Sequence, residues 1–334
     1  MKTPVDKLDR LFRDFARSGA PGLSAMVIRS GEPIVARADG LADLDAPTPC
    51  RLTTNYRLAS LTKAFTAMAV LRLAERQQLA LTDRLTDFFP EFPPIGGRIT
   101  LRHLLHHTAG VLDYEDLLPP GTRLAVSDRD VLRLLLPHDR TRFRPGTRFR
   151  YSNSGYALLA LVVEVVSGHT FAAFLQRHIF GPLGMTGTVA YEAGLSTVTE
   201  RAFGHSRSGA GFTRTDQSLT SSVLGDGGIY SSIADLFHWD QALYGEGLVS
   251  RATLRQAFTP GPATTRSGTG YGFGWFLDHR HDARRVWHYG ETAGFTTRIE
   301  RFPERRFTVI LLANRSDAPL AALARAITDS FLPR

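Results

Sequence analysis

The order of strand-like and helix-like segments constrains the fold of this 334-residue chain more than any other feature. Near the N-terminus, segments 22–29 and 33–40 have strand patterns and are joined by the turn Ser30-Gly31, which predicts a β-hairpin. After residue 270, aromatic or β-branched segments return, separated by turn residues. These four segments are 272–278, 285–289, 296–302 and 307–313. Such segregation predicts an α+β protein with one antiparallel sheet, flanked by helices, made from both ends of the chain.

The long middle of the chain is expected to be helical, because residues that commonly cap helices precede its apolar segments. Helix starts are expected at Thr82, Thr100, Ser127, Thr170 and Ser232, with a further helix over 154–166 closed by Gly168. An opening helix is expected over about residues 5–18, and Asp317 is expected to cap a last helix that runs to Ile327.

These elements predict a single domain over residues 1–334. Its α/β lobe is expected from about 1–80 and 270–334, and an all-helical lobe from about 81–269. The run Gly225-Asp226-Gly227-Gly228 is read as a tight turn. A cleft between two lobes is a usual place for a binding site.

The predicted helix over 61–74 is apolar almost all the way round, which indicates a buried helix. Ser60 begins it, where free backbone N–H groups and the helix dipole favour developing negative charge. Lys63 lies three residues further on the same face. The only other lysines are Lys2 and Lys7, and every other basic residue is arginine. Since a buried lysine can lose its proton and arginine cannot, the pair is a candidate serine nucleophile with a lysine base. On this spacing alone, an N-cap serine beside a snorkelling lysine is the better explanation, because the pattern is common by chance.

Two further clusters are candidates for the same site. Tyr151-Ser152-Asn153 follows a turn and precedes a buried helix, so a phenol and an amide could serve proton transfer and substrate binding. Taken alone, this stretch is better explained as a turn with an N-cap asparagine. His288 ends a predicted strand, and Gly290 would allow another backbone to approach closely. A lone histidine on a strand is, however, more often structural.

Composition narrows the class of protein. The net charge of +8 and pI near 10.0 raise the question of nucleic acid, but the arginines are interspersed with acids and form no basic cluster. No apolar run is long enough to cross a membrane, and the first residues lack a secretory signal, so a cytoplasmic location is expected, or a periplasmic or secreted one if the sequence is a processed form. The single cysteine, Cys50, excludes an internal disulfide. No metal or other cofactor is expected, because His103, His106 and His107 lack a carboxylate in register; His107 is read as the end of a helix.

Taken together, the three clusters resemble the serine β-lactamase-like superfamily, in particular its branch of class C β-lactamases, DD-peptidase-type penicillin-binding proteins, D-aminopeptidases and β-lactamase-like esterases. The resemblance runs from about Leu8 to Ile327. The matching segments are Ser60-Leu61-Thr62-Lys63, Leu104 to Gly110, Tyr151-Ser152-Asn153, Gly181 to Met185, Gly227 to Ser232 and His288-Tyr289-Gly290.

The resemblance implies a role for each site residue. Ser60 would be acylated, while Lys63 and Tyr151 would share the proton transfers. Asn153 would hold Lys63 and the substrate. The backbone N–H groups of Ser60 and Glu291 would form the oxyanion hole.

His288 stands where β-lactamases of this branch carry a lysine. A histidine is mostly neutral at pH 7 and offers no fixed positive charge to a substrate carboxylate. Tyr289 adds bulk where a small hydroxyl residue is common. Both departures favour neutral esters.

We therefore expect a serine hydrolase that forms a covalent acyl-enzyme on small carboxylic esters. Two alternatives stay open. The first is a D-stereospecific peptidase, DD-peptidase or weak β-lactamase, which would act on amides or β-lactams. The second is a non-catalytic ligand-binding homologue, against which the presence of Ser60, Lys63 and Tyr151 argues. The expected partner is a small molecule, with neither nucleic acid nor membrane, and the sequence leaves the oligomeric state open.

Overall fold

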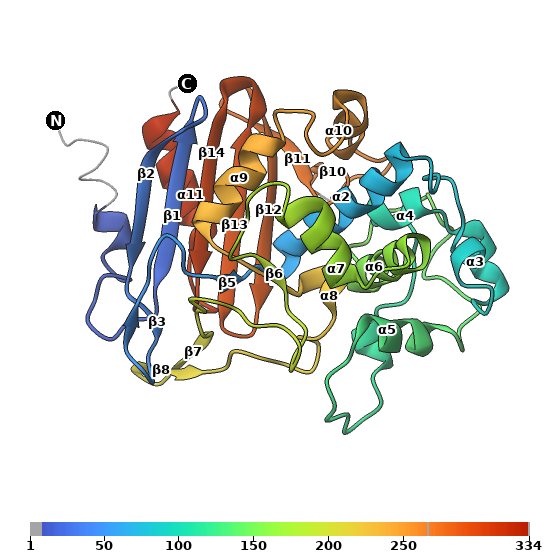
Figure 1. The fold of residues 1–334 in the computed structure, drawn as a ribbon, viewed down its shortest axis with the longest axis horizontal. Coiled ribbons are helices and arrows are strands. Elements are labelled where there is room, and N and C mark those ends of the chain that lie inside the picture. The colour runs from blue at the N-terminus through green and yellow to red at the C-terminus, as the bar shows by residue number, and fades with distance from the viewer. Residues whose placement is uncertain (1–8, 266, 333–334) are drawn as a thin grey trace.

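The fold is built on a seven-stranded antiparallel sheet, seen in a computed structural model that describes residues 9–265 and 267–332. The strand order is β10-β11-β12-β13-β14-β1-β2 (Figure 1). The strands are β1 (Leu23–Arg29), β2 (Glu32–Asp39), β10 (Gly270–Tyr271), β11 (Phe276–Arg280), β12 (Ala283–Thr292), β13 (Phe295–Phe302) and β14 (Phe307–Ala313). Strand β1 pairs with β14 from Leu23↔Ala313 to Arg29↔Phe307, so the two ends of the chain share one sheet, as predicted.

Helices cover both faces of this sheet. The closing helix α11 (Leu320–Phe331) packs on one face of β13 and β14, and α9 (Ile233–Ala242) packs on the other face of β14 and β1 (Figure 1). Alternate residues of β1 point to opposite faces of the sheet. Val27 packs beneath α11, whereas Met26 faces the main core. Strands β13 and β14 are therefore buried along their whole length.

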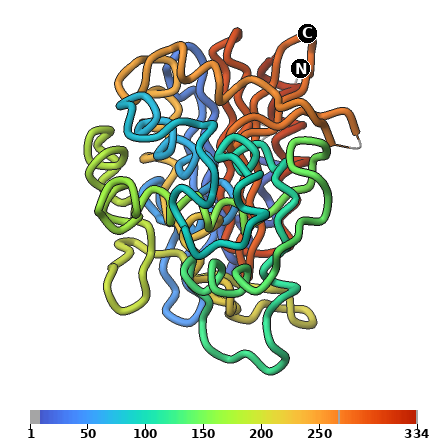
Figure 2. The backbone as a smooth tube through the Cα atoms, turned by 90° about the vertical axis from the view of Figure 1, so that its right-hand side faces the viewer, coloured from blue at the N-terminus to red at the C-terminus, as the bar shows by residue number. Residues whose placement is uncertain are grey.

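The helical part of the chain lies beside the sheet, facing the viewer in Figure 2. Its helices are α2 (Thr62–Glu75), α3 (Leu85–Phe88), α4 (Leu101–Leu105), α5 (Asp128–Leu135), α6 (Asn153–Ser167) and α7 (Phe171–Leu175). The central helix α6 is buried from Ser154 to Val163 and packs against α2, α4 and α5. Most predicted starts are confirmed, since side chains cap four helices and Gly168 ends α6 in the left-handed conformation. The four caps are Thr100, Ser127, Thr170 and Ser232.

Some expected boundaries were wrong. Helix α3 starts after Arg84 rather than at Thr82. The strand expected from residue 272 begins at Phe276, because Gly272 N–H donates to Trp275 O at 2.8 Å and closes a turn. Asp317 does not cap α11, since its carboxylate pairs with arginines 315 and 207 instead.

The segment expected as an all-helical lobe, about 81–269, is not all helical, because short strands lie between α7 and α9. A small sheet and a hairpin lie there, and α9 returns to the large sheet. The small sheet joins β5 (Tyr56–Arg57), β9 (Ile229–Ser231) and β6 (Val189–Ala190), and the hairpin joins β7 (His205–Ser208) and β8 (Gly211–Arg214). These strands are two to four residues long, too short for a recognisable alternation.

Two further expectations concern the opening helix and the possibility of a membrane-spanning helix. Of the opening helix, residues 9–12 are helical, while residues 5–8 lie outside the described part of the chain. Within residues 9–265 and 267–332, no single helix is long and apolar enough to span a membrane; only α6 and the segment Phe171–Phe180, bent by 75°, would pass by length and composition together.

Candidate active site

Ser60 lies in a short 3-10 turn, η1 (Ala59–Leu61), that leads directly into the buried helix α2. Ala59 has φ = +49°, a conformation that is rare for a residue with a side chain and is found where the surroundings impose it. The hydroxyl of Thr297 on β13 donates to the Leu58 carbonyl at 2.7 Å and anchors the turn to the sheet. The strained turn holds Ser60 partly exposed at the start of the helix.

Lys63 is completely buried, and its amine contacts three oxygen atoms. Nζ lies 3.0 Å from Ser60 Oγ, 2.8 Å from Asn153 Oδ1 and 2.9 Å from the Asp226 carbonyl oxygen. The amide and backbone oxygens can only accept hydrogen bonds, whereas the serine hydroxyl can also donate. A neutral amine would therefore give its two hydrogens to Asn153 and Asp226 and turn its lone pair toward Ser60. This geometry suits a base for the serine.

The buried surroundings of Lys63 also favour its neutral form. Burial lowers the pKa of Lys63 to about 8, against the opposing effect of the carboxylates of Asp226 and Glu115. Burial raises the pKa of Asp226, which Lys63 in turn lowers. A fraction of Lys63 is thus neutral near pH 7.

Tyr151 stacks over Lys63, with Nζ 4.8 Å from the ring centroid. Its hydroxyl is buried and makes no hydrogen bond within the described part of the chain. Burial raises the pKa of Tyr151 well above its ordinary value, although the nearby Ser60 hydroxyl opposes that rise. The phenol is therefore protonated at neutral pH, ready to donate a proton to a reacting group.

Asn153 is the first residue of α6, and Ser152 caps this helix by accepting from Gly155 N–H at 3.2 Å. The alternative that Asn153 is the cap is therefore wrong, and its amide is free to face the site. Asn153 Oδ1 binds Lys63, and Nδ2 donates to Glu115 Oε1 at 2.8 Å. The amide thus links the amine to a carboxylate.

His107 fixes the loop that carries Tyr151. Its Nδ1 accepts from Ser152 N–H at 3.1 Å, and its ring packs 4.3 Å from the Tyr151 ring. Helix α4 ends at Leu105, as the sequence reading of a helix end requires, but the contact with Tyr151 was not foreseen. Burial, together with the charge of Lys63, lowers the pKa of His107 well below its ordinary value, so the ring is neutral.

His288 on β12 is buried, and its ring is held at both nitrogens. Nε2 lies 3.1 Å from Tyr271 Oη, and Nδ1 lies 2.7 Å from Tyr289 O and 2.9 Å from Tyr289 N. Burial and, second, the charge of Lys63 lower the pKa of His288 to about 3. The ring is therefore neutral, as expected from the sequence, and cannot supply a positive charge to a substrate.

The edge of β12 beside Ser60 is open, because pairing with β11 stops at Trp287. Tyr289 N–H donates to the His288 ring, and Glu291, two residues further along β12, presents its N–H on the same side of the strand. A Cβ on Gly290 would lie 2.2 Å from Leu58 O, so only glycine allows β12 this close to the Ser60 turn. The N–H groups of Glu291 and Ser60 stay the predicted oxyanion hole.

Sequence reasoning missed the contribution of residues 225–228. This run is not a simple turn but the end of a short helix, α8 (Leu224–Gly227), whose carbonyl at Asp226 binds Lys63. The buried carboxylate of Asp128 accepts from Leu224 and Gly225 N–H at 2.7 and 3.0 Å and fixes this segment. A backbone contact leaves no side-chain signature, although the Gly-Asp-Gly-Gly composition does signal close packing.

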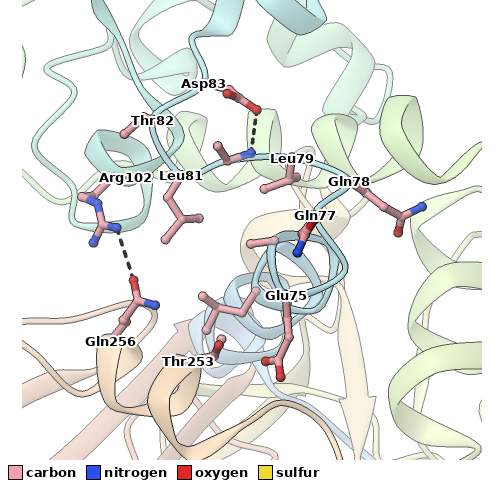
Figure 3. A pocket seen from close by; sticks show the side chains of 13 residues that line it. Glu75, Gln77, Gln78, Leu79, Leu81, Thr82, Asp83, Arg102, Thr253 and Gln256 are labelled. Atoms are coloured by element: carbon pink, nitrogen blue, oxygen red, sulfur yellow. Dashed lines mark hydrogen bonds between the residues drawn. The ribbon is translucent and has the colours of Figure 1, made fainter.

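A polar hollow of about 590 Å³ lies elsewhere, between the end of α2, the loop after it and α10 (Arg251–Ala257) (Figure 3). Arg102 donates to Gln256 across it at 3.2 Å, and Asp83 accepts from Ala80 N–H at 2.7 Å. Its described lining includes no serine, cysteine, histidine or lysine, so it offers no nucleophile–base pair. Within residues 9–265 and 267–332, no group of three or more His, Cys, Asp or Glu side chains could hold a metal ion.

The chain is similar to known proteins over most of its length. The family model described as Beta-lactamase matches residues 8–330. Penicillin-binding protein 4* of Bacillus subtilis is 31% identical over 326 residues, covering 93% of this chain and 72% of that protein. The putative penicillin-binding protein PbpX of the same organism is 30% identical, covering 82% and 66%.

Solved structures with a similar fold include penicillin-binding proteins and an amidase. A penicillin-binding protein from Bacillus halodurans superposes with a TM-score of 0.81 and 27% identity, covering 97% of this chain and 99% of that one. A D-amino acid amidase from Ochrobactrum anthropi SV3 superposes with a TM-score of 0.82, covering 98% of both chains. At 22% sequence identity, the similarity to this amidase shows a shared fold only.

Proposed function

Because the chain belongs to the Beta-lactamase family of serine hydrolases, we propose that it hydrolyses small carboxylic esters through a covalent intermediate on Ser60. One observation carries the proposal: Lys63 Nζ lies between the Ser60 hydroxyl and two oxygens that only accept. That arrangement directs a lone pair of the neutral amine at the serine proton. A protein that only bound ligands would not need to keep a lysine buried and partly neutral.

The reaction would proceed in two halves. Ser60 Oγ attacks the substrate carbonyl while its proton passes to Lys63 Nζ, and the N–H groups of Ser60 and Glu291 stabilise the oxyanion. Collapse of the tetrahedral adduct breaks the bond to the leaving group. Tyr151 gives its proton to that group and regains one from Lys63. Water then attacks the acyl-serine, with the same groups moving protons in reverse, and frees the acid.

Neutral His288 supports the choice of substrate. A substrate carboxylate entering this site would meet no fixed positive charge at that position, and its desolvation would go uncompensated. Esters without a carboxylate avoid this cost. The alternative is an amide or β-lactam substrate, favoured by the likeness to penicillin-binding proteins.

Covalent labelling tests the proposal. A fluorophosphonate should add once per chain, and peptide mapping should place it on Ser60. The Ser60→Ala variant should not be labelled, whereas Ser206→Ala, which removes another partly exposed hydroxyl, should be labelled normally. Labelling at another residue of an active enzyme would refute the assignment.

A substrate panel then separates the classes. We expect p-nitrophenyl esters to be hydrolysed faster than nitrocefin or D-alanyl peptides, with Ser60→Ala as the blank. EDTA should leave the rate unchanged. Faster turnover of nitrocefin or of the peptides would favour the alternative, and no turnover of any substrate by folded protein would favour a non-catalytic homologue.

A further inference from the structure

Asp128 is a buried carboxylate whose position the start of its own helix does not explain. It is the first residue of α5, yet Ser127 caps that helix and Asp130 completes the capping box. The carboxylate is only 7% exposed and, in the part of the chain that the structure describes, forms no ion pair within 4.0 Å. Burial raises the pKa of Asp128 to about 7. A carboxylate without a cation is costly to bury, so its other contacts must account for it.

Those contacts are two backbone N–H groups of α8. Asp128 Oδ2 accepts from Leu224 N–H at 2.7 Å, and Oδ1 accepts from Gly225 N–H at 3.0 Å. These N–H groups oppose the rise in the pKa of the carboxyl, because they stabilise its charged form. The side chain therefore turns away from α5 and holds the segment that carries the Asp226 carbonyl.

Thr66 holds the same segment from α2, one turn beyond Lys63. Its buried hydroxyl donates to the Gly225 carbonyl at 2.7 Å. A Cβ on Gly225 would lie 2.3 Å from Tyr156 O, so α8 also lies directly against α6. Gly225 is thus fixed by its N–H, by its carbonyl and by packing. The next residue along the chain, Asp226, presents its carbonyl to Lys63 Nζ at 2.9 Å.

The Asp226 carbonyl decides where the lone pair of Lys63 points. A neutral amine has two hydrogens and one lone pair, and Asn153 Oδ1 accepts one hydrogen at 2.8 Å. With that acceptor alone, the second hydrogen and the lone pair can exchange places. The carbonyl of Asp226 takes the second hydrogen and leaves the lone pair for the Ser60 hydroxyl, 3.0 Å from Nζ.

We propose that Asp128 and Thr66 are positioning residues of the reaction: together they hold the Asp226 carbonyl where it directs the lone pair of Lys63 toward Ser60. The inference rests on the proposed function, because it concerns the proton transfer from Ser60. Among the described residues, neither side chain bonds to Ser60 or to the Lys63 amine, so both act through α8.

Two substitutions loosen α8 from different sides. Asp128→Asn keeps the shape of the side chain but has one acceptor oxygen, so either Leu224 or Gly225 N–H loses its partner. Thr66→Val keeps the shape of the side chain, removes the hydroxyl and leaves the charge of the protein unchanged. The rate constant for fluorophosphonate labelling of Ser60 and kcat for a p-nitrophenyl ester should each fall by about tenfold or more, with KM unchanged.

Combination with Lys63→Met separates positioning from a general structural role. If Asp128 and Thr66 act through the amine, removing the amine first should leave either substitution with a further effect of about twofold or less on both rates. A residue that only supported the fold would lower both rates by the same factor in either background. Asp130→Asn is the matched control, since it removes a carboxylate from the same turn of α5, and it should keep wild-type rates.

Thermal melts establish which variants are folded, and Thr66→Val alone decides if Asp128→Asn is not. Two results would overturn the inference: wild-type rates in the folded variants, or equal losses with and without Lys63. Either can occur while the wild-type protein is labelled at Ser60 and hydrolyses the ester. Failure of the proposed function is a separate outcome, seen as wild-type protein that is not labelled at Ser60 and turns over no ester.

Discussion

Replacing Lys63 by arginine separates a catalytic amine from a structural cation. The substitution keeps the positive charge and matches the basic residue that the chain uses almost everywhere else. A guanidinium cannot give up its proton at any working pH, so it cannot accept one from Ser60. Losing a general base costs on the order of 10²–10⁴ in rate, and we expect kcat/KM to fall by that factor.

The pH profile makes the test sharper. With a pKa of about 8, Lys63 is mostly protonated below pH 8 and mostly neutral above it. Since only the neutral amine accepts the proton, kcat/KM of the wild type should rise by about tenfold from pH 7 to pH 9 and then level off. The arginine variant should be slow and flat over the same range.

Two companion variants control for size and charge. Lys63→Met removes the amine at similar length and should be as slow as Lys63→Arg. Arg76→Lys makes the reverse exchange at the exposed end of the same helix and should keep wild-type activity. Thermal melts establish that each variant is folded. A well-folded Lys63→Arg enzyme within tenfold of the wild type, with an unchanged profile, would refute the role of Lys63 as base.

Four other outcomes are expected. Tyr151→Phe should lower kcat by about 10²–10⁴ and by more than His288→Ala does, measured with one ester; a rate within a few-fold of the wild type would contradict a role in proton transfer for the phenol. Gly290→Ala should strongly reduce activity and lower the melting temperature, because its Cβ would lie 2.2 Å from a carbonyl oxygen; unchanged kinetics would refute the close approach of β12. Asp240→Ala should lower the free energy of unfolding in urea by about 3–5 kcal/mol, since it strands a completely buried arginine paired at 2.6 Å. The same measurement should show stability rising from pH 8 to pH 10 in the wild type and less so in Lys63→Met.

The sequence was sufficient for the parts of the fold that local patterns encode. The helix expected over 61–74 is found as α2, and the strands over 296–302 and 307–313 are found almost to the residue. Asp317 shows the limit of such patterns. A residue that can cap a helix can equally pair with arginines: Arg315 lies two residues earlier in the chain, and Arg207 is brought near only by the tertiary structure.

The candidate site was predictable to the extent that it consists of side chains in recognisable motifs. The structure brings Ser60, Lys63 and Asn153 into contact, as the resemblance implied. The carbonyl of Asp226 and the carboxylate of Glu115 could not be foreseen, because backbone oxygens carry no sequence signal and Glu115 is one acid among several in its loop. Their importance appears only when three segments distant in sequence meet.

The burial that makes Lys63 a base also costs stability, and the sign of that cost can be worked out. In the unfolded chain the lysine has its ordinary pKa of 10.5, whereas in the folded protein burial lowers the pKa to about 8. Between these values the unfolded chain binds more protons, so the free energy of unfolding rises with pH by at most about 1.4 kcal/mol per unit. Below pH 8 both states are protonated and the penalty is complete. The burial of Asp226 acts in the acidic range and does not overlap with this window. A lysine that served only the fold would gain nothing from this penalty, whereas a base for Ser60 requires it.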